Sequence, residues 1–435
     1  MMSPDLLKRE LDTVTAHAMA YRGKFANSFQ DFIRNRKLSM ETTIKLLLSM
    51  DGGSLKKELY DSGIDVTASA FVQQRTKISS NLFREILKNF NQFCGDTNTY
   101  KGYRILAVDG TCINMARNPK SESFVSYDSN PKGYNQMHLN PLYDVCSKTY
   151  FDCVIQPQPK SDEIGALIQM LYQNDFEGKN LIVADRGYES YNVFAHLLNH
   201  GGADFLIRVK QDKSAMRDIA KLPMVQLDTD VSFTITTTQT NEDKKNGNIL
   251  IQIPKKNTKQ NSPKTRIGRW DFPSPYPMKF RVVRFKLDTG EYETLATSLP
   301  RCFTMEDMKE LYHMRWGIET SFRELKYCIG LVNLHGKKDE FVKQEIYAAL
   351  TMYNFCNRIS NAVVIEQKET NIYAYKVNFT MAIYLCKQFY KNPNASGEKL
   401  MQDIVRYTEP IRLGRNDERN IKAKSFAGFT YRVSA

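Results

Sequence analysis

The chain has 435 residues, which is enough for about two to four domains with substantial cores. Hydrophobic residues make up 42% and charged residues 25%, as in a folded soluble protein. The sequence shows no apolar signal core at its amino terminus and no run of ~18 apolar residues, so we expect neither secretion nor a membrane span. Lys and Arg number 61 against 48 Asp and Glu, and this net charge of +13 favours a polyanionic partner.

The eight cysteines are scattered through apolar patterns and form no C-x-x-C pair. This use of cysteine is typical of buried free thiols in a reducing compartment. We therefore expect a cytoplasmic protein that does not span a membrane.

Residues 1–99 are predicted to be a helical, DNA-binding region. Apolar residues recur with the helix period through SMETTIKLLLSM, SLKKELYDSG and SAFVQQRTKISSNLFREILKNFNQF. The arrangement ELYDSG–IDVTASAFVQQRTK is typical of a helix, a turn and a second helix. That second helix carries polar residues suited to DNA, with Arg75 as the candidate contact. A helical hairpin whose polar face binds nothing is an equally good interpretation.

Between residues 100 and 208 the apolar period changes to that of an α/β domain. GYRILAVDG, QMHLNPLYDV and TYFDCVIQP predict three strands, and a helix, a strand, a helix and a strand follow in SDEIGALIQMLYQ, NLIVADRG, ESYNVFAHLLNHG and DFLIRVK. Asp109 ends the first strand and Asp185 ends the fourth. Asp-Gly at 109–110 and Asp-Arg-Gly at 185–187 are each, taken alone, a routine turn signal. If these two strands are neighbours in one sheet, their carboxyl ends lie side by side and bring the two acids together.

Residues 209–300 interrupt this order with a β-rich, basic insertion. VSFTITTTQ, GNILIQIP, KFRVVRFKL and YETLATSLP alternate like strands. Residues 241–288 hold twelve Lys or Arg and four Asp or Glu, a net charge of 12 − 4 = +8. Such a concentration favours a polyanion surface, and a merely solubilising loop is the alternative. The predicted DNA contacts here are Lys255, Lys256, Arg266 and Arg269.

The stretch YHMRWGIETSFRELK, within the segment 301–340, lines up four functional groups on one predicted helix. At ~100° per residue they fall within an arc of roughly 60°, beside an apolar stripe: Tyr312, Arg315, Glu319 and Lys326. A solvated face with helical ion pairs would account for only part of this set. A helix crossing the strand edge would bring Glu319 over both aspartates, and three carboxylates there suit Mg²⁺, which in pairs ~3.5–4 Å apart serves phosphoryl transfer.

The pattern Tyr-x2-Arg-x3-Glu-x6-Lys, preceded by DGT at 109–111 and DRGY at 185–188, resembles the DDE transposases of bacterial insertion sequences, in particular the branch defined by that Tyr-Arg-Glu-Lys signature. The resemblance implies an α/β RNase H-like catalytic core with a β-rich insertion, flanked by helical N-terminal and C-terminal regions, the latter being 341–435 with a basic tail. It implies two Mg²⁺ ions, or Mn²⁺ in their place, held by the catalytic residues Asp109, Asp185 and Glu319. It also implies phosphate contacts by Tyr312, Arg315 and Lys326.

The function implied by the resemblance is that of a transposase, which binds the ends of its insertion sequence and catalyses metal-dependent DNA cleavage and strand transfer. The expected partners are double-stranded DNA, as terminal inverted repeats and as target, and a second copy of the chain in a homodimeric synapse. The expected location is the bacterial cytoplasm, at the nucleoid when the protein is bound to DNA.

Other interpretations stay open. His196 and His200 have the spacing of zinc ligands on a helix, although helix packing is the expected role. Trp270 and Tyr276 are candidates for holding an unpaired base, again with core packing as the expected role. For the whole protein, a glycosidase would use paired carboxylates, a non-catalytic descendant of a transposase would only bind DNA, and a metal-dependent nuclease would cut without joining.

Overall fold

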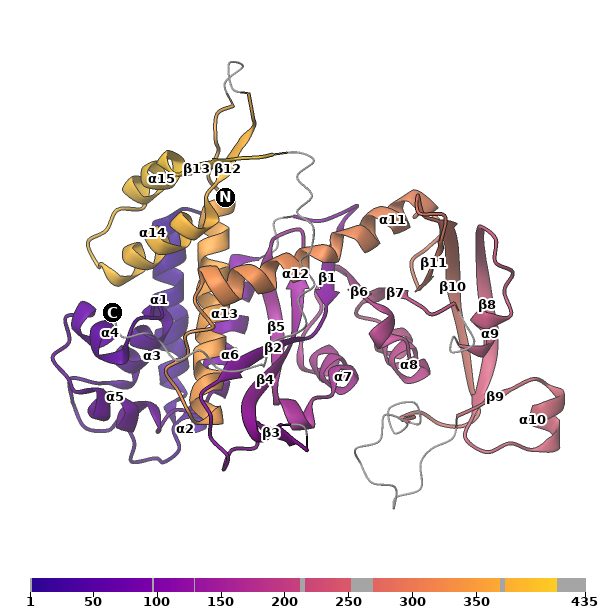
Figure 1. Cartoon of the computed structure of the whole chain (residues 1–435), viewed down its shortest axis with the longest axis horizontal. Coiled ribbons are helices and arrows are strands. Elements are labelled where there is room, and N and C mark those ends of the chain that lie inside the picture. The colour runs from indigo at the N-terminus through magenta and orange to yellow at the C-terminus, as the bar shows by residue number, and fades with distance from the viewer. Residues whose placement is uncertain are drawn as a thin grey trace.

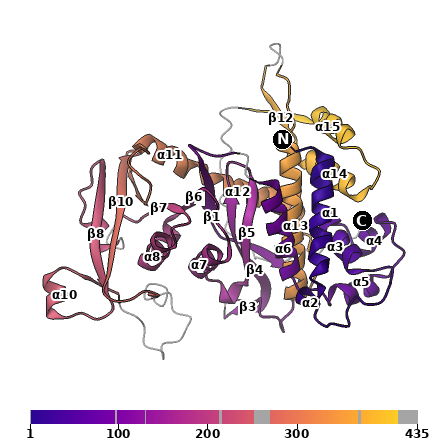
Figure 2. The ribbon, with the colours of Figure 1, turned by 180° about the vertical axis from the view of Figure 1, so that it is seen from behind.

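The computed structural model describes residues 2–95, 98–128, 130–211, 216–251, 269–367 and 372–412. One β-sheet runs through the middle of the molecule, with a helical body at one end and a long antiparallel extension at the other (Figure 1, Figure 2). Within those ranges, no helix is both long enough and apolar enough to cross a membrane.

Helices fill the N-terminal part of the chain. They are α1 (Pro4–Ala20), α2 (Arg22–Phe25), α3 (Met40–Ser49), α4 (Leu55–Asp61), α5 (Ala68–Arg75) and α6 (Asn81–Cys94). The side chains of Ser3, Ser39, Ser54 and Thr67 each accept a backbone N–H of the first helical turn. Such caps fix where α1, α3, α4 and α5 begin.

The helix α13 (Asp339–Asn361) joins the N-terminal helices to the sheet. Most of its side chains are buried, because it packs against α3 and α6 on one side and against the sheet on the other. The two helices α14 (Phe379–Lys391) and α15 (Gly397–Arg406) complete the helical body, beside a small ladder of β12 (Tyr375–Val377) and β13 (Thr408–Pro410). The two ends of the described chain therefore share one hydrophobic core.

The centre of the sheet has the strand order β5–β4–β1–β6–β7. Three of these strands are parallel, namely β1 (Tyr103–Val108), β6 (Lys179–Ala184) and β7 (Asp204–Arg208). The long strand β4 runs antiparallel to β1 and also pairs with β5 and two shorter strands; these four are β4 (Asn130–Asp144), β5 (Thr149–Pro157), β2 (Thr111–Met115) and β3 (Phe124–Tyr127). The two short strands are absent from the sequence prediction.

The strands expected in the insertion extend this same sheet. The strand β11 pairs with β7 and the order continues outward through β10, β8 and β9. Their bounds are β8 (Leu227–Thr236), β9 (Ile249–Leu250), β10 (Tyr276–Lys286) and β11 (Tyr292–Thr297), with the short helices α9 (Arg217–Ala220) and α10 (Asn241–Lys245) beside them. The pairing covers the edge of β7, which would otherwise expose unpaired backbone groups.

Helices cover both faces of the central strands. The pair α7 (Glu163–Gln173) and α8 (Tyr191–His200) packs on the face that carries Leu106 and Val108 of β1. The pair α11 (Met305–Met314) and α12 (Trp316–Arg323) lies on the opposite face, over Ile105 and Ala107. Successive side chains of a strand alternate between faces, so each pair of helices meets a different row of apolar side chains.

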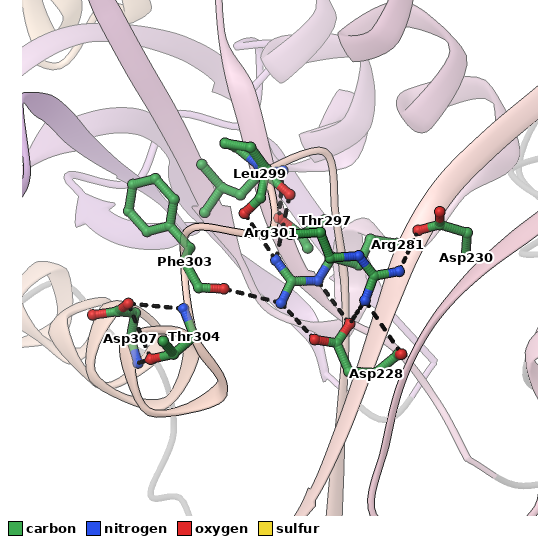
Figure 3. Close-up of polar contacts among 10 residues, drawn as sticks. Asp228, Asp230, Arg281, Thr297, Leu299, Arg301, Phe303, Thr304 and Asp307 are labelled. Atoms are coloured by element: carbon green, nitrogen blue, oxygen red, sulfur yellow. Dashed lines mark hydrogen bonds and ion pairs between the residues drawn. The ribbon is translucent and has the colours of Figure 1, made fainter.

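Two arginines that belong to the basic charge of the insertion are internal. Arg281 is 5% exposed and donates to both carboxylate oxygens of Asp228, at 2.8 and 2.7 Å, and to the carbonyl oxygen of Phe303 at 2.9 Å (Figure 3). Arg301 contacts the same Asp228 from the surface. Arg284 is also buried and donates to the Thr294 hydroxyl at 2.8 Å.

These contacts tie β10 to the connection that precedes α11. Directly after it, Thr304 and Asp307 form the capping box that begins α11 (Figure 3). Charge that is buried and paired in this way cannot contact an outside partner. Part of the net charge of +8 counted over 241–288 is therefore structural.

Candidate active site

Asp109 and Asp185 lie side by side at one edge of the central sheet. Their strands are parallel neighbours with Val108 opposite Ala184, and each aspartate directly follows the last residue of its strand. By the alternation of side chains, both carboxylates continue the row that packs against α11 and α12. The adjacency on which the sequence argument depended is therefore present.

The segment that carries Glu319 is not one straight α-helix. Arg315 lies between α11 and α12, where the N–H of Arg315 donates to the carbonyl of Tyr312 at 3.2 Å and that of Ile318 donates to the carbonyl of Arg315 at 3.1 Å. These i→i−3 bonds tighten the turn. After α12 the chain passes into a π-helical turn, Glu324–Cys328. The single helical face expected for the four signature residues is thus interrupted twice.

Arg315 links the carboxylate of Asp109, which follows β1, to the carboxylate of Glu319 in α12. Its Nη1 lies 3.8 Å from Oδ2 of Asp109 and its Nη2 lies 3.3 Å from Oε1 of Glu319. The guanidinium is buried beside the rings of Tyr312 and Trp316, at 5.7 and 5.0 Å from the ring centroids. Its buried Nε finds no hydrogen-bond partner among the described residues. The fork therefore retains donor capacity for a further acceptor.

Burial and like charge act together on Asp109. Burial raises the pKa of Asp109 to about 6, and the nearby Asp185 and Glu319 carboxylates raise it too, against the opposing N–H of Gly110 and the charge of Arg315. Asp109 and Glu319 both pair with the Arg315 guanidinium, and Asp185 adds a third carboxylate at the end of the next strand. One cation among three carboxylates favours the binding of a further cation. Carboxylate oxygens are the donors that Mg²⁺ prefers.

The distances in this site are not those of a preformed metal cage. Among the described residues, no three His, Cys, Asp or Glu side chains are close enough to hold an ion as they stand. The Arg315 guanidinium lies between Asp109 and Glu319 instead. The carboxylate oxygens are therefore of the type that binds a hard cation, but their spacing does not form a ready site.

Lys326 and Tyr312 border the carboxylates from two directions. The Nζ of Lys326 donates to the hydroxyl of Thr111 at 2.7 Å, so the π-helical turn meets the Asp-Gly-Thr segment, and burial lowers the pKa of Lys326. Tyr312, in α11, is buried in the core between this helix and the sheet. Lys326 therefore supports the turn after β1, and Tyr312 packs against Arg315.

Sequence reasoning missed a pair that lies against Gly110. Nε2 of His138 is 3.0 Å from Oε1 of Glu163, without an aligned hydrogen bond, and its Nδ1 is 3.3 Å from the thiol of Cys112. A Cβ on Gly110 would fall 2.5 Å from that Oε1 and 2.7 Å from that Nε2. Burial lowers the pKa of His138, but Cys112 and Glu163 outweigh it and raise the value to about 9. The only signal in the sequence was the glycine itself.

Arg75 is buried, and the prediction that it contacts DNA is wrong. Its side chain is 1% exposed and donates to Gln344 at 3.0 Å, to Glu345 at 2.7 Å and to the carbonyl of Phe341 at 2.8 Å. All three acceptors belong to α13. The guanidinium therefore fastens α5 to α13 inside the protein.

Three of the four DNA contacts predicted in the insertion lie outside the described residues, namely Lys255, Lys256 and Arg266. Arg269 is half-exposed, with its Nε 3.0 Å from Asp271 and its Nη1 3.8 Å from Asp162. A DNA contact by Arg269 stays a prediction, and it would compete with these two acids.

The packing roles expected for two other pairs are confirmed. His196 contacts Tyr172 and Asp271, each at 3.0 Å, and His200 packs edge-on against the ring of Tyr172. Trp270 is buried in the core beside α8, with the ring of Tyr276 at 5.3 Å.

Comparisons with known proteins agree on a family for the central part of the chain. The family described as transposase DDE domain matches residues 100–355. The putative transposase InsL for insertion sequence element IS186A of Escherichia coli strain K12 is 24% identical over 270 residues, 58% of this chain and 65% of the relative. The transposase for insertion sequence element IS421 of Escherichia coli matches equally well. The match thus spans a little under two thirds of these relatives.

A solved structure, the piggyBac transposase synaptic complex with hairpin DNA, aligns with 96% of this chain and 87% of its own at a TM-score of 0.43 and 11% identity. Similarity of that degree carries no argument about this chain.

Proposed function

Because the chain belongs to the transposase DDE domain family, which its residues 100–355 match, we propose that it is a transposase that binds the ends of an insertion sequence and catalyses DNA cleavage and strand transfer. The observation that carries the proposal is the pairing of Asp109 and Glu319 with Arg315 at one edge of the sheet, with Asp185 directly after the neighbouring strand. The insertion-sequence relatives named above support the same reaction.

We also infer that the catalytic core is RNase H-like. The order β5–β4–β1–β6–β7 supports this, with β4 antiparallel to both neighbours, β1, β6 and β7 parallel to one another, and helices on both faces. In this interpretation residues 209–300 form an insertion that lengthens the sheet before the chain returns as α11.

The three acids are the proposed ligands of Mg²⁺. When bound, the metal would activate the attacking water or hydroxyl and stabilise the departing oxygen. Asp109 and Asp185 are fixed by adjacent strands, and Glu319 by α12, so the chain itself orients the three carboxylates. Asp109 is partly buried, and burial is the main reason that its pKa is raised to about 6.

Arg315 is the proposed contact to the scissile phosphate. A guanidinium offers two parallel N–H donors to phosphate oxygens, and the ion pairs of Arg315 with Asp109 and Glu319 are long, at 3.8 and 3.3 Å. Lys326 supplies a second positive charge at Thr111, directly beside the Asp109 turn. Double-stranded DNA, as element ends and as target, and a second copy of the chain in the synapse are the proposed partners, in line with the net charge of +13.

The test is a Mg²⁺-dependent reaction on duplexes that carry the DNA flanking the gene. The proposal expects a nick at the element end that exposes a 3′-hydroxyl, followed by joining of that end to a target plasmid. Cutting without joining identifies a nuclease, and binding without cutting identifies a non-catalytic DNA-binding protein. Either result contradicts the proposed function.

A further inference from the structure

Three buried tyrosines lie next to the segment that carries Glu319. Their rings meet edge to face, with centroids 4.9 to 6.4 Å apart. We call this group the tyrosine cluster: Tyr143 of β4, Tyr150 of β5 and Tyr353 of α13. Each of the three residues is at most 3% exposed. A buried phenol needs a hydrogen-bond partner for its hydroxyl, so the partners of these hydroxyls show what the cluster holds in place.

The first contact of the tyrosine cluster is with the middle of α12. The hydroxyls of Tyr150 and Ser321 lie 2.9 Å apart. The Ser321 hydroxyl donates its own proton to the carbonyl of Ile318 at 2.7 Å, so Tyr150 is the donor to Ser321. Tyr150 is itself held, because its backbone N–H donates to Oδ1 of Asn354 in α13 at 2.7 Å. The bond therefore ties α12, two residues after Glu319, to the sheet and to α13.

The second contact is with the joint between α12 and the π-helical turn. The hydroxyl of Tyr353 donates to Oε2 of Glu324 at 2.7 Å, and the hydroxyl of Tyr143 lies 3.3 Å from that of Tyr353. Glu324 directly follows α12 and is the first residue of the π-helical turn. Two residues further on, Lys326 donates to the hydroxyl of Thr111. The Tyr353 hydroxyl therefore holds the point at which the helical geometry changes.

Regular helix geometry fixes α12 at neither end. The i→i−3 bonds around Arg315 separate it from α11, and it ends in a π-helical turn, a feature frequent at functional sites. With eight residues, α12 takes its position from packing rather than from its own backbone bonds. Ile318 and Phe322 pack in the core, but hydrogen bonds are directional and also fix the rotation of the helix. That rotation decides how near the Glu319 carboxylate comes to Asp109.

We propose that the hydroxyls of Tyr150 and Tyr353 position Glu319 over the two aspartates of the candidate active site. Both hydroxyls act through α12, because each is bonded to a side chain of the segment that carries Glu319. The proposal rests on the proposed function, in which Glu319 shares a metal site with those aspartates. Since α13 also packs against α3 and α6, Tyr353 makes the helical body part of the geometry of that site.

The experiment compares two tyrosines of α13 in the full chain, each of which loses one buried hydroxyl. Tyr353→Phe removes the bond to Glu324. Tyr347→Phe is the matched control, because the Tyr347 hydroxyl is also buried and donates to the carbonyl of Cys153 in β5 at 2.9 Å. Binding of Mn²⁺ is measured by electron paramagnetic resonance, cleavage of element-end duplexes in single turnover with Mg²⁺, and melting temperature by calorimetry.

The two variants should lose similar amounts of melting temperature, because each loses one buried hydrogen bond. Tyr353→Phe should also weaken Mn²⁺ binding and slow cleavage by about tenfold or more, the loss usual when residues that orient metal ligands are changed. Tyr347→Phe should match the parent in both. A tyrosine that only stabilises the fold would change the melting temperature and leave the affinity for Mn²⁺ as it is.

Changes at Glu324 test whether the bond itself is responsible. Glu324→Gln keeps an acceptor oxygen and should retain Mn²⁺ affinity and cleavage, whereas Glu324→Leu removes the acceptor and should repeat the losses of Tyr353→Phe. Because both changes remove the same bond, combining Glu324→Leu with Tyr353→Phe should add little to either alone. Glu324 is only partly buried, so Glu324→Leu provides the same test if Tyr353→Phe does not fold.

The outcomes separate this proposal from the proposed function. Parental Mn²⁺ affinity and cleavage in Tyr353→Phe, equal losses in Tyr353→Phe and Tyr347→Phe, or fully additive losses in the double variant would each overturn the proposal while the parent stays active. If the parent protein neither binds Mn²⁺ nor cleaves the duplexes, the proposed function fails, and the positioning role fails with it.

Discussion

Replacing Gly110 by Ala tests how closely the chain is packed around the turn after β1. The added Cβ would lie 2.5 Å from Oε1 of Glu163, and 2.7 and 2.8 Å from Nε2 and Cε1 of His138. The Glu163 carboxylate can swing away, because it is partly exposed. The His138 ring is buried between this glycine and Cys112, so the turn that carries Asp109 must move instead.

Overpacking of this kind costs roughly 1–3 kcal/mol. For a domain of this size that lowers the melting temperature by roughly 3–9 °C. A displacement of about 1 Å at a reacting group costs on the order of 100-fold in rate. We therefore expect Gly110→Ala to reduce Mg²⁺-dependent cleavage by about that factor and to leave duplex affinity unchanged, as measured by single-turnover cleavage, calorimetry and gel shift.

Gly317, in α12 of the same site, provides the matched control. A Cβ there would meet the Val145 side chain at 3.6 Å, an ordinary contact. Gly317→Ala should be neutral or stabilising by up to ~1 kcal/mol through helix propensity. Adding Glu163→Ala to Gly110→Ala should recover part of the lost stability. If Gly110→Ala is as stable and active as the parent, or if both alanine variants are equally harmful, the packing argument is refuted.

Three further predictions concern the buried arginines. Arg75→Met leaves the buried Glu345 carboxylate with His335 but without its charged partner, and should cost about 3–5 kcal/mol in urea unfolding. The duplex affinity of the folded fraction should be unchanged, and a loss of affinity at full stability would restore the DNA-contact interpretation. Burial raises the pKa of Glu345, but Arg75 and His335 outweigh it and hold the value at about 2. A pKa that is lower in the folded state than its ordinary value near 4.5 stabilises the fold above that pH. The free energy of unfolding should therefore fall as the pH drops from about 4.5 towards 2, and Glu345→Gln should make this fall less steep. An equal pH dependence in the parent and the variant would contradict the pairing. Arg281→Leu leaves Asp228 and the Phe303 carbonyl without their shared donor, and should lower unfolding stability by at least ~2 kcal/mol; an unchanged urea midpoint would exclude the proposed tie between β10 and α11.

Local sequence patterns identified the strands and the two aspartates of the candidate site. The apolar runs before Asp109 and Asp185 are long and end in turn residues, so β1 and β6 could be read directly. Their adjacency was an assumption that the register of the two strands supplies. The predicted strand QMHLNPLYDV covers only the later part of β4, because Pro131 and Gly133 near the start of β4 are typical of turns.

Contacts between distant segments account for what could not be predicted. Arg75 looks like a surface residue on a polar helix, and its partners come from α13, 266–270 residues further along the chain. Similarly, His138 and Glu163 meet at Gly110 only because β4 and the start of α7 converge there. No local period signals such a meeting. The break at Arg315 precedes α12, which packs on β1, and the π-helical turn at Lys326 packs against α13 and α14, so both also lie where distant segments meet.

The central claim is that Glu319 acts with Asp109 and Asp185 in one catalytic site. Glu319→Gln keeps the size of the side chain and removes its charge, and Glu306→Gln on α11, where the parent side chain is 78% exposed, is the matched control. The decisive measurement is single-turnover Mg²⁺-dependent cleavage of duplexes carrying the element's ends, with gel-shift binding to the same duplexes. The account predicts that Glu319→Gln binds as the parent does and cleaves at least ~100-fold more slowly, while Glu306→Gln matches the parent in both. Normal cleavage by Glu319→Gln would contradict it.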